Sequence, residues 1–306
     1  MPNPGPSPLH AAILARAQRW IFDRTVAIYV RQPEGNPRQW GSGVLLQINE
    51  EDVFLVSASH VIEMAREGEL LIGSMSPEAR DLVLLGQSVR IRTTDTQKVD
   101  VAVVRLSASA IETLAPFKHA QHIARLDSSR ALPQGCYYVA GYPLEITTTD
   151  HVARAITIGG YTLTTYLVES DNAHRGVSIA LAHNREHSVV RGSDGELTRA
   201  PHLEGISGCG IWRLWSSDQE EQLEAWDESW ICLVGIEHRI TKTTVIGTMA
   251  FHVFEMLART QPTQLSVTSR GIKLSFPCQG AERAEGDLDT QPAPIRVDSI
   301  VSERDE

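Results

Sequence analysis

Three short segments carry side chains that could together perform nucleophilic catalysis. In chain order they are SASHVIE around His60, KVDVAVVRL around Asp100 and EGISGCGIW around Ser207. A serine hydroxyl is a poor nucleophile at neutral pH until an imidazole accepts its proton, and that imidazole needs a carboxylate on its other nitrogen to fix its tautomer and orientation. One histidine, one aspartate and one serine are the minimum set for this chemistry, and each of the three stands beside a predicted strand.

The elements that must position these side chains are predicted to be mostly strands. From Thr25 onward the chain consists of short runs rich in Val, Ile, Leu and Tyr, broken by Gly, Pro, Asn and Asp, such as TVAIYV, VFLVSAS and VDVAVVRL. Many strands at short intervals favour a sandwich or a barrel. The alternation of strands with helices that a doubly wound sheet requires is absent, so we predict an all-β fold.

Helices are predicted at both ends of the strand-rich region. Ser7 as an N-cap and Pro8 at the first helical position precede apolar residues at helical spacing, which predicts an amphipathic helix over about residues 8–22. Apolar residues at the same spacing in GTMAFHVFEMLART predict a closing helix over about residues 248–259. The segments HVIEMAREG and SASAIETLA are expected to form short helices between strands.

The chain therefore divides into three predicted parts. Residues 1–24 form an N-terminal helical extension, residues 25–260 form the strand-rich domain, and residues 261–306 form an acidic tail. From Gly280 the tail contains no aromatic residue, and a segment of that composition buries too little apolar surface to offset its ordering entropy. We expect the tail to be flexible or bound to a partner.

Composition narrows the classes of partner and compartment. The 306 residues include 28 Lys and Arg against 38 Asp and Glu, giving a net charge of −10, which argues against nucleic acid or an anionic membrane as a partner. No run approaches the roughly 20 apolar residues that a spanning helix needs, and MPNPGPSPLH has no secretory pattern, so we expect a cytoplasmic protein. Its four scattered cysteines form no CxxC pair and are expected to be reduced thiols.

The order of His60, Asp100 and Ser207 resembles that of the chymotrypsin-like (trypsin-like) serine peptidases. The segment SASH resembles the family's turn of two small residues before the histidine, and DVAV resembles the strand that its aspartate opens. The segment GISG matches the family's G-x-S-G nucleophile loop. The tripeptide GYP at residues 141–143 and Gly235-Ile236 resemble the bacterial, HtrA-like branch, whose members are not zymogens.

This resemblance implies a fold and a mechanism. It implies a double six-stranded β-barrel and a serine endopeptidase that cleaves a protein or peptide substrate without a cofactor. Ser207 would be the nucleophile, His60 the general base and Asp100 the residue that orients it, while the backbone amides of Gly205 and Ser207 would form the oxyanion hole. Ile206 stands where zymogen-activated members carry an aspartate, so activation by insertion of a new N-terminus is not expected.

The resemblance also suggests which residues line the primary specificity pocket. Pro201 occupies the position, six residues before Ser207, where trypsin-type enzymes carry an acidic residue, so a preference for Lys or Arg is not supported. Three basic or potentially basic side chains could instead favour an acidic or polar substrate residue. The expected pocket residues are Pro201, His202, Leu203, Glu237, His238, Arg239 and Ile240.

Two other functions remain open at this stage. His183, Glu186 and His187 spell H-x-x-E-H, an inverted zinc-peptidase motif, but that motif requires a helix and the flanking VSIALA and HSVVRG are strand-like. The second alternative is an inactive peptide-binding scaffold of the same fold, against which the complete set of three catalytic residue types argues. In either case the acidic tail or the acidic insertion at residues 216–229 could dock a regulatory partner.

Overall fold

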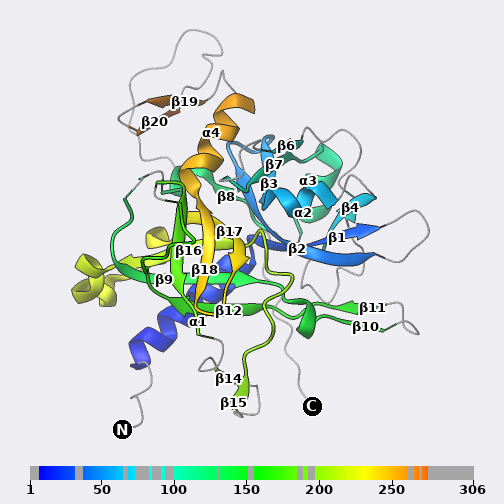
Figure 1. Ribbon diagram of the computed structural model, residues 1–306. Coiled ribbons are helices and arrows are strands. Elements are labelled where there is room, and N and C mark those ends of the chain that lie inside the picture. Colours follow the sequence, from blue (N-terminus) through cyan, green and yellow to red (C-terminus); the bar gives the residue numbers. More distant parts are fainter. Residues whose placement is uncertain are drawn as a thin grey trace.

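The computed structural model describes residues 7–31, 37–64, 68–73, 83–84, 91–93, 99–116, 118–127, 129, 131–150, 155–174, 176–184, 189–191, 197–260, 265–268 and 271–274. This part of the chain is mostly β-structure, arranged as two curled sheets with helices at their margins (Figure 1). The helices are α1 (Pro8–Phe22), α2 (Ser59–Glu63), α3 (Ala108–Leu114) and α4 (Ala250–Thr260). Short 3₁₀ helices are η2 (Ile123–Arg125), η3 (Leu144–Ile146), η4 (Ser217–Ala225) and η5 (Glu228–Trp230).

The first sheet contains the N-terminal strands. Its strands pair in the order β5-β4-β1-β2-β3-β7-β6, all antiparallel, and β8 adds a short parallel pairing with β2. The bounds are β1 (Thr25–Arg31), β2 (Arg38–Gln47), β3 (Val53–Ser57), β4 (Glu69–Gly73), β5 (Val83–Leu84), β6 (Ile91–Thr93), β7 (Ala102–Arg105) and β8 (Gln121–His122).

The second sheet has six antiparallel strands in the order β12-β9-β16-β17-β18-β13. Its two edges approach each other, because Leu167, just after β12, forms an antiparallel bridge with Leu181 of β13. The bounds are β9 (Gly135–Gly141), β12 (Tyr161–Thr165), β13 (Ser178–Ala182), β16 (Gly210–Ser216), β17 (Cys232–Ile240) and β18 (Thr244–Met249).

Three separate hairpins complete the described strands. They are β10 (Thr148–Asp150) with β11 (Ala155–Thr157), β14 (Val189–Arg191) with β15 (Leu197–Arg199), and β19 (Leu265–Thr268) with β20 (Gly271–Leu274). The last hairpin was not predicted, and it lies within the segment that the sequence assigned to the acidic tail. Residues 275–306 of that tail lie outside the described residues.

Apolar side chains form one core inside each sheet and a third cluster that joins them. Leu55 and Val104 lie in the core of the first sheet, and Val139 and Ile211 lie in that of the second. The third cluster contains Trp212 from the second sheet together with apolar residues of the first sheet, α1 and α4. Helix α4 contacts β7 as well as β17 and so touches both sheets.

Helix α1 begins and ends at the predicted residues. The Ser7 hydroxyl accepts a hydrogen bond from the His10 amide, which confirms the predicted N-cap. Ile13, Ala17 and Ile21, spaced four residues apart, are buried in the cluster that joins the sheets. In Figure 1 the helix lies beside β9, and it is therefore packed into the folded core rather than being a peripheral extension.

The acidic insertion also packs more closely than a surface hairpin would. Residues 217–225 and 228–230 form the 3₁₀ helices η4 and η5. The side chains of Leu223, within η4, and of Trp226, between the two helices, are buried. The Trp226 indole N–H donates to the Leu214 carbonyl at 3.0 Å. The acidic side chains of this insertion remain exposed, among them Asp218, Glu220, Glu221 and Glu224.

The structure confirms the mostly β fold and the positions of the two terminal helices, with α4 starting two residues later than predicted. The expected pair of six-stranded barrels is met only in part. The first sheet has eight strands, and no strand pairing among the described residues joins its edge strands β5 and β6.

None of the described helices is long and apolar enough to cross a membrane.

Candidate active site

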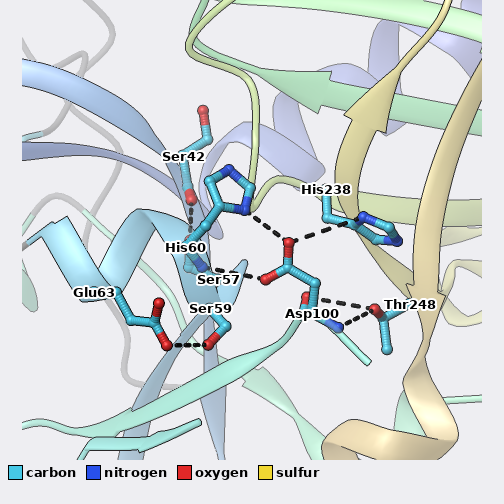
Figure 2. Close-up of polar contacts among 8 residues, drawn as sticks. All are labelled: Ser42, Ser57, Ser59, His60, Glu63, Asp100, His238 and Thr248. Atoms are coloured by element: carbon cyan, nitrogen blue, oxygen red, sulfur yellow. Dashed lines mark hydrogen bonds and ion pairs between the residues drawn. The ribbon is translucent and has the colours of Figure 1, made fainter. Parts of the chain in front are cut away.

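His60 and Asp100 form a direct pair through their side chains. His60 Nδ1 lies 2.7 Å from Asp100 Oδ2, and the His60 backbone amide donates to Asp100 Oδ1 at 3.2 Å. Figure 2 shows that the other nitrogen of the His60 ring points away from the carboxylate. Because an ionised carboxylate only accepts hydrogen bonds, it stabilises the neutral imidazole tautomer with the proton on Nδ1, which leaves Nε2 as a proton acceptor.

The local sequence explains why these two residues meet. His60 lies in the first turn of α2, directly after β3, and Asp100 lies two residues before β7, which pairs with β3. The Asp100 backbone is tied to Thr248 of β18, because its amide donates to Thr248 Oγ1 at 3.2 Å and its carbonyl accepts from that hydroxyl at 3.3 Å. Asp100 is thus held between the two sheets.

The Asp100 carboxylate is stabilised in its charged form. Burial opposes ionisation, but the hydrogen bond and the charge of His60, together with a smaller contribution from His238, outweigh it and lower the pKa of Asp100. A carboxylate that stays ionised at neutral pH can hold the imidazole and stabilise the imidazolium form if the ring takes up a proton.

Ser207 lies in a tight turn that depends on two glycines. Gly205 and Gly208 have φ angles of 94° and 91°, in the left-handed region that side chains disfavour. A Cβ added at Gly208 would lie 2.0 Å from Ser57 Oγ and 2.2 Å from the Ser42 carbonyl oxygen. The G-x-S-G spacing therefore reflects both backbone conformation and close approach to the first sheet.

The amides of this turn fall into two groups. Those of Ile206, Gly208 and Cys209 donate to backbone carbonyls within 3.2 Å, the Gly208 amide to the carbonyl of Glu237. The amides of Gly205 and Ser207 donate to no acceptor in the described part of the chain. These are the two donors that the sequence predicted for an oxyanion hole.

The turn lies against the segment that carries His60. The Ser42 amide donates to the Ser207 carbonyl at 2.8 Å, and a Cβ added at Gly41 would lie 2.7 Å from both that carbonyl oxygen and Val61 Cγ1. Ser207 is therefore a close neighbour of α2. Among the described residues, however, no hydrogen bond joins the Ser207 hydroxyl to the His60 imidazole.

Glu237 is a second ionisable neighbour of Ser207. Its side chain is fully buried, and neither carboxyl oxygen has a hydrogen-bond partner with good geometry in the described structure. Burial, reinforced by the negative charge of Asp100, raises the pKa of Glu237 to about 8, and the Arg239 amide and the Ser207 hydroxyl oppose this shift. At neutral pH the group is therefore mostly an uncharged acid.

The other candidates for the specificity pocket are spread over different surroundings. Pro201 and Leu203 are buried, His202 and Arg239 are exposed, and Ile240 is half-buried. His238 faces Asp100, with its Nδ1 3.9 Å from Asp100 Oδ2 (Figure 2). The three side chains expected to favour an acidic substrate thus differ in exposure, since His202 and Arg239 are exposed and His238 is half-buried.

Sequence reasoning missed the hydroxyl groups that support the site. The Ser42 hydroxyl donates to the Gly205 carbonyl and accepts from the Tyr142 amide, both at 3.0 Å. The Ser57 hydroxyl donates to the Ser42 carbonyl at 2.8 Å. Ser57 lies within the SASH segment, which singled out His60 alone, and nothing in the local sequence around Ser42 indicates these long-range contacts.

The structure describes only one of the three residues of the predicted zinc motif. His183 directly follows β13 and donates its amide to the Thr243 carbonyl at 2.8 Å, whereas Glu186 and His187 lie outside the described residues. No group of three potential metal ligands occurs among the residues described. Cys209 is fully buried, and burial raises the pKa of its thiol, which is typical of a small core residue rather than of a nucleophile.

Comparisons with known proteins give little further guidance. No protein-family model and no curated protein matches the chain. One similar solved structure comes from work on how aromatic interactions drive the coupled folding and binding of the intrinsically disordered Sesbania mosaic virus VPg protein. That similarity has 14% sequence identity and a TM-score of 0.41, and it covers 76% of this chain and 87% of the other.

Proposed function

We propose that this protein is a serine endopeptidase of the chymotrypsin-like class, acting through Ser207, His60 and Asp100. The observation that carries the proposal is the 2.7 Å contact between His60 Nδ1 and Asp100 Oδ2 beside the Ser207 turn. An aspartate–histidine pair next to a glycine-flanked serine is the arrangement that activates a hydroxyl nucleophile. Two curled sheets that meet at this site are compatible with the double-barrel fold of that class.

The proposed reaction proceeds through an acyl-enzyme. Ser207 Oγ attacks the substrate carbonyl carbon while His60 Nε2 takes the hydroxyl proton, and Asp100 stabilises the resulting imidazolium. The imidazolium then gives its proton to the leaving amine as the peptide C–N bond breaks. Water attacks the ester in the same way, releasing the acid and restoring the Ser207 hydroxyl.

Two backbone amides are available for the charge that develops on the substrate oxygen. Those of Gly205 and Ser207 have no acceptor within the described structure, so no hydrogen bond would have to break before they bind an oxyanion. In related chemistry, one such donor contributes about 3 kcal/mol to transition-state stabilisation. The unpaired amides therefore support acyl transfer more directly than they support a passive peptide-binding role.

The Ser207 hydroxyl must turn toward His60 for this reaction. It acts at present on the buried Glu237 carboxyl group, where it opposes the rise in pKa that burial causes. Catalytic hydrogen bonds in unliganded enzymes are often long or misaligned and shorten when substrate binds. Rotation about the Ser207 Cα–Cβ bond is the smallest change that redirects the hydroxyl, and the turn already packs beside α2.

The test is hydrolysis of a diverse library of internally quenched peptides. We expect Ser207→Ala and His60→Ala each to reduce kcat/KM by at least about 10³-fold, with no effect of a chelator on the wild type. Ser217→Ala, which alters an exposed serine of η4, is the matched control and should retain full activity. A wild-type protein that binds peptides without cleaving any would instead favour the scaffold, and loss of activity on chelation would favour the zinc hypothesis.

A further inference from the structure

Asp100 has a second imidazole beside it. His238 Nδ1 lies 3.9 Å from Asp100 Oδ2, the same oxygen that contacts His60 Nδ1 at 2.7 Å. Figure 2 shows the two rings on opposite sides of the carboxylate. His238 reaches this position from β17, whereas His60 comes from α2, so the carboxylate lies between histidines of the two sheet systems.

The surroundings of His238 favour its neutral form. Its side chain is only 16% exposed, and its Nε2 is buried with no hydrogen-bond partner in the described structure. Burial lowers the pKa of His238, the charge of Asp100 raises it, and His60, Arg239 and His174 lower it further. These four residues are the charged or titratable groups that act on the ring.

Neutral His238 then has one tautomer that suits its neighbours. The carboxylate accepts hydrogen bonds only, so the ring proton belongs on Nδ1, the nitrogen that faces Asp100. A distance of 3.9 Å is too long for a direct hydrogen bond. An approach of about 1 Å, or one bridging water, would complete the contact.

We infer that His238 is a positioning residue that holds the Asp100 carboxylate in the orientation required by His60. This inference rests on the proposed function, because it assigns a role within the proposed triad. No hydrogen bond or ion pair joins His238 to Ser207 in the described part of the chain, so its effect is expected to pass through Asp100. This role differs from the one in substrate binding that the sequence predicts for His238.

The substitution His238→Leu separates this role from simple space filling. Without the Nδ1–H donor, Asp100 is held on one side only, and we expect kcat to fall about tenfold while KM changes less than about threefold. The carboxylate charge is then no longer shared with His238, so it stabilises the His60 imidazolium more strongly. The acid limb of kcat/KM should consequently move to higher pH, by about half a unit.

Restoring a donor at the same place should restore the function. The side-chain amide of His238→Asn can place an N–H where Nδ1 stands, so this variant should recover kcat to within about threefold of wild type and return the acid limb to its original pH. If the Leu and Asn variants lose activity equally with unchanged pH profiles, His238 has only a packing role and the inference is wrong.

His252 provides the matched control. It is 15% exposed, its Nδ1 lies 3.0 Å from Glu255 Oε2, and its Nε2 is also buried without a partner among the described residues. It therefore resembles His238 in burial and pairing but lies on α4 and contacts a different carboxylate. His252→Leu should leave kcat and the acid limb unchanged.

A measurement independent of catalysis distinguishes failure of this inference from failure of the proposed function. Because Asp100 raises the pKa of His238, Asp100→Asn should lower the His238 midpoint in an NMR titration of the imidazole nitrogens. If Asp100→Asn lowers the midpoint but the wild-type protein cleaves no peptide, the His238–Asp100 coupling stands and the peptidase proposal is wrong. If the midpoint is unchanged and the wild-type protein cleaves peptides, the coupling alone is wrong.

Discussion

At the residue scale, Glu237 is the group whose burial is hardest to explain by stability. A carboxyl group with both oxygens unpartnered in the described structure costs free energy that an apolar residue would not. It lies beside Ser207, on the strand that also carries His238. Groups that are buried at such a cost occur most often where function requires them.

This burial makes the stability of the protein depend on pH. The pKa of Glu237 is about 8 in the folded state against an ordinary value of 4.5. Between these values the unfolded chain releases the proton while the folded chain keeps it, so the free energy of unfolding falls as pH rises and levels off above about 8.

We expect Glu237→Gln to remove this pH dependence. The variant should gain stability relative to wild type as pH rises from about 5 to 8, by up to about 3 kcal/mol at neutral pH. Urea unfolding of both proteins at several pH values measures the difference. A difference that stays constant across this range would show that the folded and unfolded states bind the Glu237 proton equally.

The Ser207 turn makes a second prediction at this scale. Gly176 and Gly208 both have positive φ angles, 74° and 91°, but a Cβ at Gly176 would meet nothing within 4 Å, whereas one at Gly208 would meet Ser57 and Ser42. Gly176→Ala should cost about 1 kcal/mol through backbone strain alone. Gly208→Ala should cost about 3 kcal/mol or more and abolish peptide hydrolysis.

Thermal unfolding and peptide hydrolysis of the two alanine variants provide the comparison. Their shared backbone conformation means that the difference between them reports the crowding at Gly208. Equal stability and retained hydrolysis in both variants would contradict the close packing described for the turn.

At the scale of elements, α1 contributes to the core that joins the sheets. Trp20 of α1 stacks edge-on against Trp212 of β16, with ring centroids 5.7 Å apart. The Lys118 ammonium is buried at the end of the helix, where it donates to the Phe22 carbonyl at 2.6 Å. Such a cation stabilises the negative end of the helix dipole and satisfies a terminal carbonyl.

We expect Ile21→Ala to destabilise the whole domain, by about 2–5 kcal/mol, because Ile21 is fully buried in this cluster. Leu9→Ala on the same helix is the control, since Leu9 is 40% exposed and its loss should change stability by less than about 0.5 kcal/mol. Chemical denaturation measures both. Equal, small effects would mean that α1 is an independent appendage.

The elements differ in how well the sequence predicted them. The spacing of Ile13, Ala17 and Ile21 and the Ser7 cap are local signals, so α1 was predicted with its observed bounds. The packing of Trp226 against β16 depends on a contact between two segments, so no local pattern in residues 216–229 predicted it. Four-residue strands such as β19 and β20 carry too few residues for a periodic pattern.

At the scale of the whole molecule, the candidate site lies where contacts cross between the sheets. Ser42 belongs to β2 of the first sheet. Its hydroxyl bonds the Tyr142 amide, directly after β9 of the second sheet, and the Gly205 carbonyl in the Ser207 turn. Thr248 of the second sheet bonds the Asp100 backbone in return. These buried hydrogen bonds fix the nucleophile turn relative to the aspartate–histidine pair.

Ser42→Ala tests this cross-sheet connection. It leaves the buried Tyr142 amide and Gly205 carbonyl without that partner, which should cost about 1–3 kcal/mol. Because the Gly205 amide is a proposed oxyanion donor, kcat of Ser42→Ala should fall more than its KM rises. Ser42→Cys should recover little of this loss, since a thiol is a weak hydrogen-bond donor. Unfolding curves and steady-state kinetics measure the two effects, and unchanged kcat in a destabilised variant would limit Ser42 to a structural role.

The sequence singled out the three candidate residues of this site but not the residues that support them. His60, Asp100 and Ser207 could be found because their segments match a known motif order. The roles of Ser42 and Thr248 could not, because a serine or threonine in a strand has the same local sequence whether or not it bonds another sheet. The position of His238 beside Asp100 was likewise not predicted, since only the fold brings the two residues together.

The central claim is that the Ser207 hydroxyl is made nucleophilic by His60. A fluorophosphonate probe followed by intact mass and peptide mapping tests it directly, because such probes esterify activated serines and do not need the natural substrate. We expect one adduct per chain, on Ser207, at a rate that falls at least about 100-fold in His60→Ala. Absence of the adduct from wild-type protein, or equal labelling of the two proteins, would contradict the account.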